Sequence, residues 1–148
     1  MATLKISGLS VGDWVMCNGF KATIAGYNAE SGSIQVLTRQ KNKMWFGIDD
    51  IQPIPITAEI LEKNGFTRSS VEFPIYEYTT LLGKMLRKTV VNLNHPYCYI
   101  ACRIEDTGKE LHELDRVHVC SSVDRNPIHI HDLQRVLRLA GIEKEINL

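Results

Sequence analysis

The stretch Ile51-Gln-Pro-Ile-Pro-Ile-Thr-Ala-Glu-Ile-Leu-Glu-Lys-Asn-Gly-Phe66 holds the strongest local structural signals of the 148-residue chain. Pro53 and Pro55 each fix their own φ and keep the preceding residue out of the helical region, so the first part of the stretch is expected to be extended. The hydroxyl of Thr57 can accept a hydrogen bond from a first-turn N–H, and Gly65 suits the left-handed position that ends a helix. The stretch therefore predicts a stiff connector followed by a short helix capped at both ends.

Apolar residues at the two ends of this helix have the spacing of packing contacts. Ile56 and Leu61 are spaced as in a hydrophobic staple, and Phe66 falls where a Schellman motif places an apolar residue against Leu61. A helix of this kind seals neighbouring β-structure rather than carrying a site. We expect Leu61 and Phe66 to be buried and in contact.

The residues before the connector read as short strands separated by turns. Asn18-Gly19 and residues 30–33 are turn sequences, and Ile34–Arg39 alternates between two faces with the period of a strand. Four or five such strands at about ten-residue spacing, with no helix between them, are typical of a small barrel or sandwich. We predict an SH3-like β-barrel over residues 1–56, by analogy at the level of the fold, and a joint helix over residues 57–66.

Residues 67–148 predict an antiparallel sheet followed by one helix. Val71–Thr80 reads as a strand that either is an edge strand or starts near Pro74, because Pro74 cannot donate a ladder hydrogen bond. Tyr97–Glu105 is an almost unbroken apolar run and the best candidate for a central strand, with Leu111–Cys120 as its partner. The sheet is therefore expected to be built from hairpins.

A C-terminal helix is predicted from apolar residues at helical spacing. Asp132 can cap its N-terminus and Gly141 can end it. Its apolar face consists of Leu133, Val136, Leu137 and Ala140. The fold class is therefore expected to be α+β, a small SH3-like β-barrel followed by an antiparallel sheet with one C-terminal helix.

Charge and composition narrow the range of functions. Residues 1–66 hold six Lys/Arg and six Asp/Glu, and residues 67–148 hold eleven of each, so neither half has the basic excess typical of nucleic-acid binders. No stretch approaches the roughly 20 apolar residues of a membrane span, and the N-terminus lacks the apolar core of a signal peptide. We expect a cytoplasmic protein with reduced cysteines and no membrane partner.

Three segments resemble those of a family. Val11-Gly-Asp-Trp-Val15, the joint Ile51–Phe66 and the closing run Ile128–Ile142 are similar to segments of small uncharacterised proteins from Bacteroidetes genomes and their phages or mobile elements. The resemblance implies an origin in a mobile element and a bacterial cytoplasm. It implies no catalytic residue, because no activity is known for that group.

One metal site is a hypothesis from the sequence. The runs Val117–Cys120 and Ile128–His131 each alternate branched apolar residues with His or Cys. If the two runs pair as strands, four potential ligands share one face, and one Cys with three His suits tetrahedral zinc. Two half-buried strands with a polar outer face explain the same pattern. The ligands would be His118, Cys120, His129 and His131.

A basic loop beside aromatic residues is the second candidate site. Arg39, Lys41 and Lys43 lead into Trp45-Phe46, so the hairpin has the charge and the stacking surface to grip single-stranded nucleic acid. A solvated hairpin tip with its aromatic residues in the core fits equally, and the balanced charge of this half favours that interpretation.

The remaining cysteines and the absence of catalytic motifs from the sequence favour a non-enzymatic protein. Cys98 and Cys102 would lie about 13 Å apart on a strand, so we expect them, like Cys17, to be buried core thiols. The sequence has no G-x-S-x-G, Walker, G-x-G-x-x-G or H-E-x-x-H motif. We expect a non-enzymatic binding or accessory protein of a bacterial mobile element that acts through protein contacts. A metal-binding protein and a single-stranded nucleic-acid binder are the alternatives.

Overall fold

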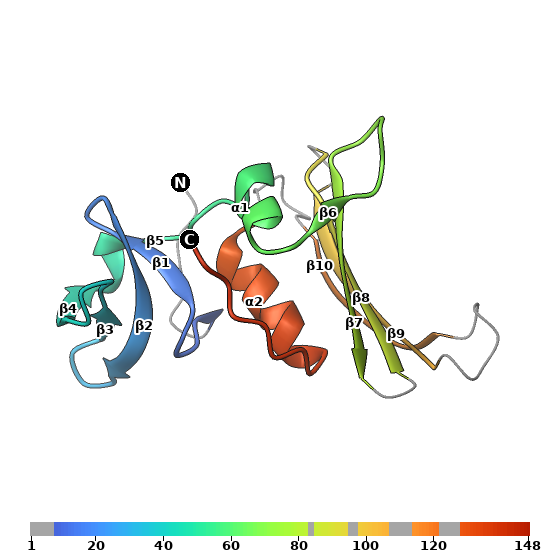
Figure 1. Cartoon of the computed structure of the whole chain (residues 1–148). Helices are drawn as coiled ribbons and strands as arrows, with labels where there is room; N and C mark the ends of the chain where they lie inside the picture. The colour runs from blue at the N-terminus through green and yellow to red at the C-terminus, as the bar shows by residue number, and fades with distance from the viewer. Residues whose placement is uncertain (1–7, 83–84, 95–97, 107–113, 122–127) are drawn as a thin grey trace. The chain divides into compact units, whose positions relative to one another are not determined.

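The fold is α+β. The computed structural model describes the following residues: 8–82, 85–94, 98–106, 114–121 and 128–148, with the backbone alone for Leu82 and for 105–106 and 114–121. Within these ranges the chain forms two five-stranded antiparallel sheets and two α-helices (Figure 1). Neither helix is long and apolar enough to cross a membrane, as far as the described residues extend.

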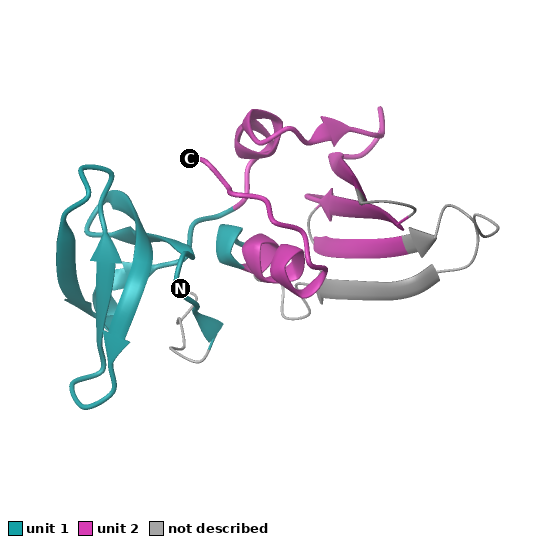
Figure 2. Ribbon diagram, turned by 60° about the horizontal axis from the view of Figure 1, so that its bottom comes forward, with its two compact units in different colours: residues 1–55, 129–131 teal, residues 56–128, 132–148 magenta. Residues whose placement is uncertain are grey.

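The chain divides into two compact units (Figure 2). Unit 1 comprises residues 1–55 together with residues 129–131, and unit 2 comprises residues 56–128 together with residues 132–148. In unit 1, Pro55 forms an isolated antiparallel bridge with His129, and the N–H of Ile130 donates to the carbonyl of Ile54 at 2.8 Å. Unit 1 is thus built from two segments that are far apart in the sequence.

The sheet of unit 1 is a curled half-barrel made of consecutive hairpins. Its order is β4-β3-β2-β1-β5, with a 3-10 turn, Ile48–Asp50, before the last strand. The strands are β1 (Trp14–Cys17), β2 (Phe20–Asn28), β3 (Ser33–Leu37), β4 (Lys43–Gly47) and β5 (Ile51–Gln52).

The core of unit 1 lies on one face of this sheet. Ile34, Val36 and Thr38 are all buried while Gln35 and Leu37 between them are not, which confirms the predicted alternation. The other buried apolar members of the cluster are Val15, Cys17, Ala22, Ile24 and Ile51.

A buried carboxylate closes the entry to β1. Asp13 is fully buried, and its Oδ2 accepts a hydrogen bond of 2.8 Å from the backbone N–H of Ser10. Its backbone carbonyl accepts from the N–H of Ile24 at 2.9 Å, which ties the turn to β2. Within the Val-Gly-Asp-Trp-Val motif, Asp13 therefore has a structural role.

The joint helix is confirmed. α1 spans Ala58–Lys63, and the side chain of Thr57 accepts a hydrogen bond from the N–H of Ile60 at 3.3 Å. Its end is a full Schellman motif, because Gly65 has φ +83° and the N–H of Phe66 donates to the carbonyl of Leu61 at 3.0 Å. Leu61 and Phe66 are buried, as expected.

The sheet of unit 2 has the order β10-β9-β8-β7-β6. The Tyr97–Glu105 run becomes β9, which is interior, although β8 occupies the centre. The expected Val71–Thr80 strand becomes β7, which begins at Ile75 because the N–H of Ile75 donates to the carbonyl of Phe73 in a turn at Pro74. The predicted start near Pro74 is therefore confirmed, whereas the edge strand beside it is β6. The strands are β6 (Thr67–Arg68), β7 (Ile75–Leu82), β8 (Met85–Asn92), β9 (Tyr99–Asp106) and β10 (Leu114–Ser121).

One face of this sheet packs against α1, the end of α2 and the chain that follows them. The rings of Phe66 and Tyr78 lie 5.3 Å apart, and the ammonium of Lys144 lies 4.4 Å from the centre of the Tyr78 ring. Arg87 Nη1 donates to the carbonyl of Gly141 at 2.6 Å, at the C-terminus of α2. These contacts tie the helices to the middle strands of the sheet.

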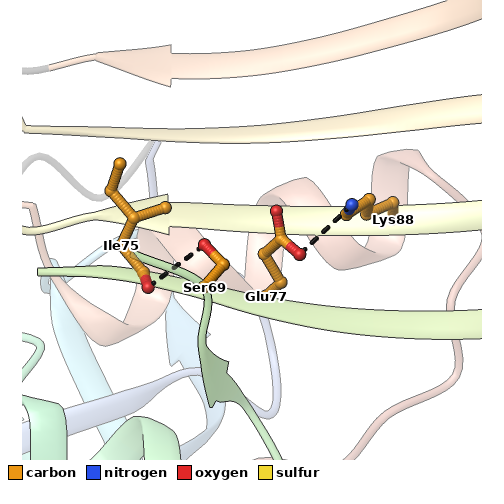
Figure 3. A network of polar contacts seen from close by, with 4 residues as sticks. All are labelled: Ser69, Ile75, Glu77 and Lys88. Atoms are coloured by element: carbon orange, nitrogen blue, oxygen red, sulfur yellow. Dashed lines mark hydrogen bonds and ion pairs between the residues drawn. The ribbon is translucent and has the colours of Figure 1, made fainter. Parts of the chain in front are cut away.

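The opposite face of the sheet carries a cross-strand ion pair. Lys88 Nζ on β8 lies 3.1 Å from Glu77 Oε2 on β7, on a diagonal between the two strands (Figure 3). Beside it, the hydroxyl of Ser69 donates to the carbonyl of Ile75 at 3.4 Å. Both side chains of the ion pair are partly exposed, so this contact adds little stability.

The C-terminal helix begins earlier than expected. α2 spans Ile130–Leu139, so Asp132 lies inside its first turn and is not the N-cap. Ile130 is buried and extends the apolar face of Leu133 and Leu137 by one turn, which explains the earlier start. The helix ends as α1 does, with Gly141 at φ +69° and another six-to-one backbone hydrogen bond.

Candidate binding site at strand β4

Strand β4 is an exposed, partly apolar edge. Among the described strands it pairs with β3 alone, so its other side offers backbone N–H and C=O groups to a partner. Met44 is 42% exposed and Trp45 is 54% exposed. We call Lys43–Gly47 the β4 edge.

The two aromatic residues of this hairpin behave differently. Phe46 packs against the core, and its ring lies 5.9 Å from that of Phe20 in an edge-to-face arrangement. Trp45 points to the other face, where it pairs in register with the outward-facing Gln35. The expectation that the aromatic residues lie in the core is therefore correct for Phe46 and wrong for Trp45, because neighbours on a strand face opposite sides.

The loop that leads into β4 is held by its own backbone. The N–H of Thr38 donates to the carbonyl of Asn42 at 2.9 Å, and the N–H of Asn42 donates to the Thr38 hydroxyl at 3.2 Å. Lys41 takes a left-handed conformation with φ +67°, and the Arg39, Lys41 and Lys43 side chains are all exposed. The three cations are thus displayed on a preformed turn.

A hollow of about 590 Å³ lies beside this loop. Lys21 and Arg39 provide two positive charges, and no carboxylate occurs among the described residues that line it. Apolar surface comes from Met16, Phe20 and Met44. We call this the basic hollow; it is completed by Gly19, Thr38, Gln40 and Asn42.

The hairpin order of the sheet explains how these residues meet. The β1–β2 and β3–β4 turns lie at the same end of consecutive antiparallel strands, so Lys21 comes next to Arg39 although the two are distant in sequence. Asn18 and Gly19 have φ +46° and +87°, as a tight two-residue hairpin requires. The sequence of the basic loop alone gave no indication of Lys21. The turn predicted at Asn18-Gly19, combined with consecutive hairpins, would have placed Lys21 beside this loop.

The predicted metal ligands fall on two kinds of structure. His118 and Cys120 lie on β10, in register with Cys102 and Ile100 of β9, and their side chains are outside the described residues. His131 is in the first turn of α2. The prediction of a strand over residues 128–131 is therefore wrong beyond His129. His129 forms a β-bridge, but the helix begins at Ile130, where the buried apolar residues follow helical spacing.

The two described histidines lie next to each other. The rings of His129 and His131 are buried and stacked, with centres 5.7 Å apart and an angle of 6° between their planes. Among the residues whose side chains are described, no group of three or more His, Cys, Asp or Glu side chains is arranged to hold a metal ion. The zinc site at His118, Cys120, His129 and His131 stays a prediction.

The cysteines whose side chains are described are buried thiols outside any disulfide, as predicted. Burial raises the pKa of Cys17 to about 11 and also raises the pKa of Cys98 and Cys102. The hydroxyl of Thr89 donates to Cys102 Sγ at 3.6 Å. Since the thiolate is the reactive form, burial that favours the neutral thiol lowers the reactivity of these three residues.

Comparison with known proteins adds no assignment. No family model matches the chain, and the searches of curated proteins and of solved structures found no match. Function is therefore inferred from the geometry of the β4 edge and the basic hollow.

Proposed function

We propose that this chain is a non-enzymatic binding protein that acts through protein contacts made at the β4 edge. The observation that carries the proposal is the exposure of Trp45 and Met44 on a strand that pairs on one side only among the described strands. An extended segment of a partner can add to such an edge by main-chain hydrogen bonds, while alternate side chains contact the exposed tryptophan. Trp is also among the residues that most often dominate binding energy at protein interfaces.

Unit 1 is proposed to be an SH3-like barrel. Its consecutive hairpins, the short turn before β5 and the pairing of β5 with β1 support that comparison. The biological setting, an accessory role for a mobile element in the bacterial cytoplasm, rests on the resemblance of the Ile51–Phe66 and Ile128–Ile142 segments.

A substitution pair tests the proposed interface. Tyr27 lies on β2 of the same unit and is 57% exposed, close to the 54% of Trp45, so Tyr27→Ala is a matched control for Trp45→Ala. The full-length variants are used to capture partners from a Bacteroidetes lysate, with recovered proteins quantified by mass spectrometry. We expect Trp45→Ala to reduce recovery of a specific partner about tenfold or more, as loss of a hot-spot residue does, and Tyr27→Ala to retain it. Equal recovery with Trp45→Ala would refute the β4 edge as the interface.

Single-stranded nucleic acid is the second candidate ligand. The exposure of Trp45 beside Arg39, Lys41 and Lys43 favours it, because bases can stack on the indole while cations hold the backbone. Binding of an oligothymidylate is measured by fluorescence anisotropy over a range of salt concentrations. Nucleic-acid binding by this hairpin requires that affinity falls steeply with salt and that Trp45→Ala lowers it. Binding that does not depend on salt, or no binding at all, would exclude this hairpin as a nucleic-acid site.

A further inference from the structure

We infer that the partner segment at the β4 edge is an extended acidic peptide whose carboxylates lie in the basic hollow. This inference rests on the proposed function, since it names the chemistry of the protein segment that β4 binds. It is carried by the distribution of charge in unit 1 and by the mixed lining of the hollow.

The charges of unit 1 are separated along the strands. Lys21, Arg39, Lys41 and Lys43 gather at the end of the sheet where β4 begins, opposite Leu37 in the register. Glu30 lies in the turn at the other end. Asp49-Asp50 follow Gly47, which pairs with Ser33 at that same far end. A strand added along β4 therefore meets positive charge at the Lys43 end and negative charge at the Gly47 end.

The lining of the hollow matches a glutamate side chain. Met16, Phe20 and Met44 offer apolar surface to methylene groups, while Lys21 and Arg39 offer charge to a carboxylate. Gln40 and Asn42 add amide groups that can donate hydrogen bonds. Two hydrogen bonds between Thr38 and Asn42, one to a backbone carbonyl and one to the Thr38 hydroxyl, hold this wall in place before a ligand binds, which lowers the entropic cost of binding.

An acidic peptide fits this charge distribution better than nucleic acid does. A nucleic-acid strand carries a phosphate at every nucleotide, so a strand running along β4 would place negative charge beside Asp49 and Asp50. A peptide can confine its carboxylates to the end beside Lys43. The balanced total charge of residues 1–66 agrees with this choice.

Three blocked peptides of equal length test the inference. In one half of each peptide, valine alternates with glutamate in the first, with glutamine in the second and with lysine in the third. The other half is the same uncharged sequence in all three, so that the charges can lie at the Lys43 end of β4 alone. Binding to the full chain is measured by calorimetry. We expect the glutamate peptide to bind about tenfold more tightly than the lysine peptide, with a difference that shrinks as salt is added, because charge complementarity sets this preference. Oligothymidylate is measured as a competitor.

Charge-reversal variants locate the effect. We expect Lys21→Glu and Arg39→Glu each to lower the affinity of the chain for the glutamate peptide and to raise its affinity for the lysine peptide. Arg135→Glu makes the same charge change on an exposed position of α2, outside unit 1, and should change neither affinity. Thermal melting of each variant checks that the fold is retained.

The outcomes separate this inference from the proposed function. Equal affinity for all three peptides, no binding of any peptide, or no effect of either reversal would overturn the acidic partner, even where Trp45→Ala still abolishes capture of a lysate protein. Tighter binding of oligothymidylate than of the glutamate peptide would overturn it in favour of nucleic acid. If the glutamate peptide binds equally well to Trp45→Ala, then the β4 edge itself is not the interface.

Discussion

The two sheets of this protein use the same number of strands for different purposes. In unit 2, one face of the sheet packs against α1, the end of α2 and the segments that follow them, through the contacts of Phe66 and Lys144 with Tyr78 and of Arg87 with Gly141. In unit 1, the smaller sheet curls around its own core and leaves β4 exposed with a tryptophan on its surface. Helices thus lie against one face of the sheet of unit 2, whereas unit 1 has in β4 an edge strand with exposed Met44 and Trp45.

The largest expected effect is the loss of a buried leucine of α2. Leu133 is fully buried, so Leu133→Ala should lower the free energy of unfolding by about 2–5 kcal/mol through lost burial and a residual cavity. Leu139 on the same helix is 54% exposed, so Leu139→Ala should change the free energy of unfolding by about 0.5 kcal/mol or less. Denaturant unfolding measures both. Similar losses for the two variants would mean that α2 is not the covering element of unit 2.

The next effect tests the contribution of the buried turn at Asp13 to the stability of unit 1. Asp13→Ala removes the acceptor of the Ser10 N–H from a fully buried position and should cost about 1–3 kcal/mol. Asp49→Ala removes an exposed carboxylate of the same unit and serves as the control. Thermal melting followed by circular dichroism reports the difference. If both variants have the same melting temperature as the wild type, the turn at Asp13 does not stabilise unit 1.

The two Schellman motifs should differ in their tolerance of a methyl group. Gly65→Ala and Gly141→Ala both force alanine into a left-handed conformation, at a cost of about 1–2 kcal/mol. A Cβ at position 141 would in addition approach Arg87 Nη1 to 3.3 Å, whereas at position 65 the nearest atom belongs to Tyr78 at 3.7 Å. Gly141→Ala should therefore be the more destabilising substitution in denaturant unfolding. The reverse order would show that Arg87 yields more easily than the ring of Tyr78.

The smallest effect is a dependence on alkaline pH that originates in unit 1. Burial raises the pKa of Cys17 from 9.0 to about 11, so the folded state keeps the neutral thiol where the unfolded chain would ionise. The stability from this group is fully present below about pH 9 and is lost as the pH rises toward about 11. Cys17→Ala should remove this part of the pH dependence. Unfolding free energies of both proteins at about pH 8 and about pH 10 measure it, and identical pH slopes would contradict it.

Local signals in the sequence predicted what depends on neighbouring residues. Thr57, Gly65 and Phe66 define the ends of α1 through contacts within one turn, so the sequence was sufficient there. Strand β7 begins at Ile75, next to the turn at Pro74, which the sequence offered as one place for its start. The start of α2 follows the burial of Ile130, which the sequence pattern had assigned to a strand, so that boundary was misplaced.

The candidate site was predictable in part. Arg39, Lys41, Lys43 and Trp45 are contiguous, so the sequence identified them as a group. Lys21 joins Arg39 through the stacking of two hairpins, and the exposure of Trp45 follows from the register of β4 with β3. Both features result from the pairing of strands, so no single stretch of sequence predicts them.

The bridge between Pro55 and His129 has a consequence for biosynthesis. Unit 1 includes residues 129–131, which leave the ribosome only after β10 has been made. Domains generally fold in the order of synthesis, N-terminal first. Here the half-barrel of unit 1 acquires its last segment only after all the described strands of unit 2 have been synthesised, so completion of unit 1 waits for synthesis of the sheet of unit 2.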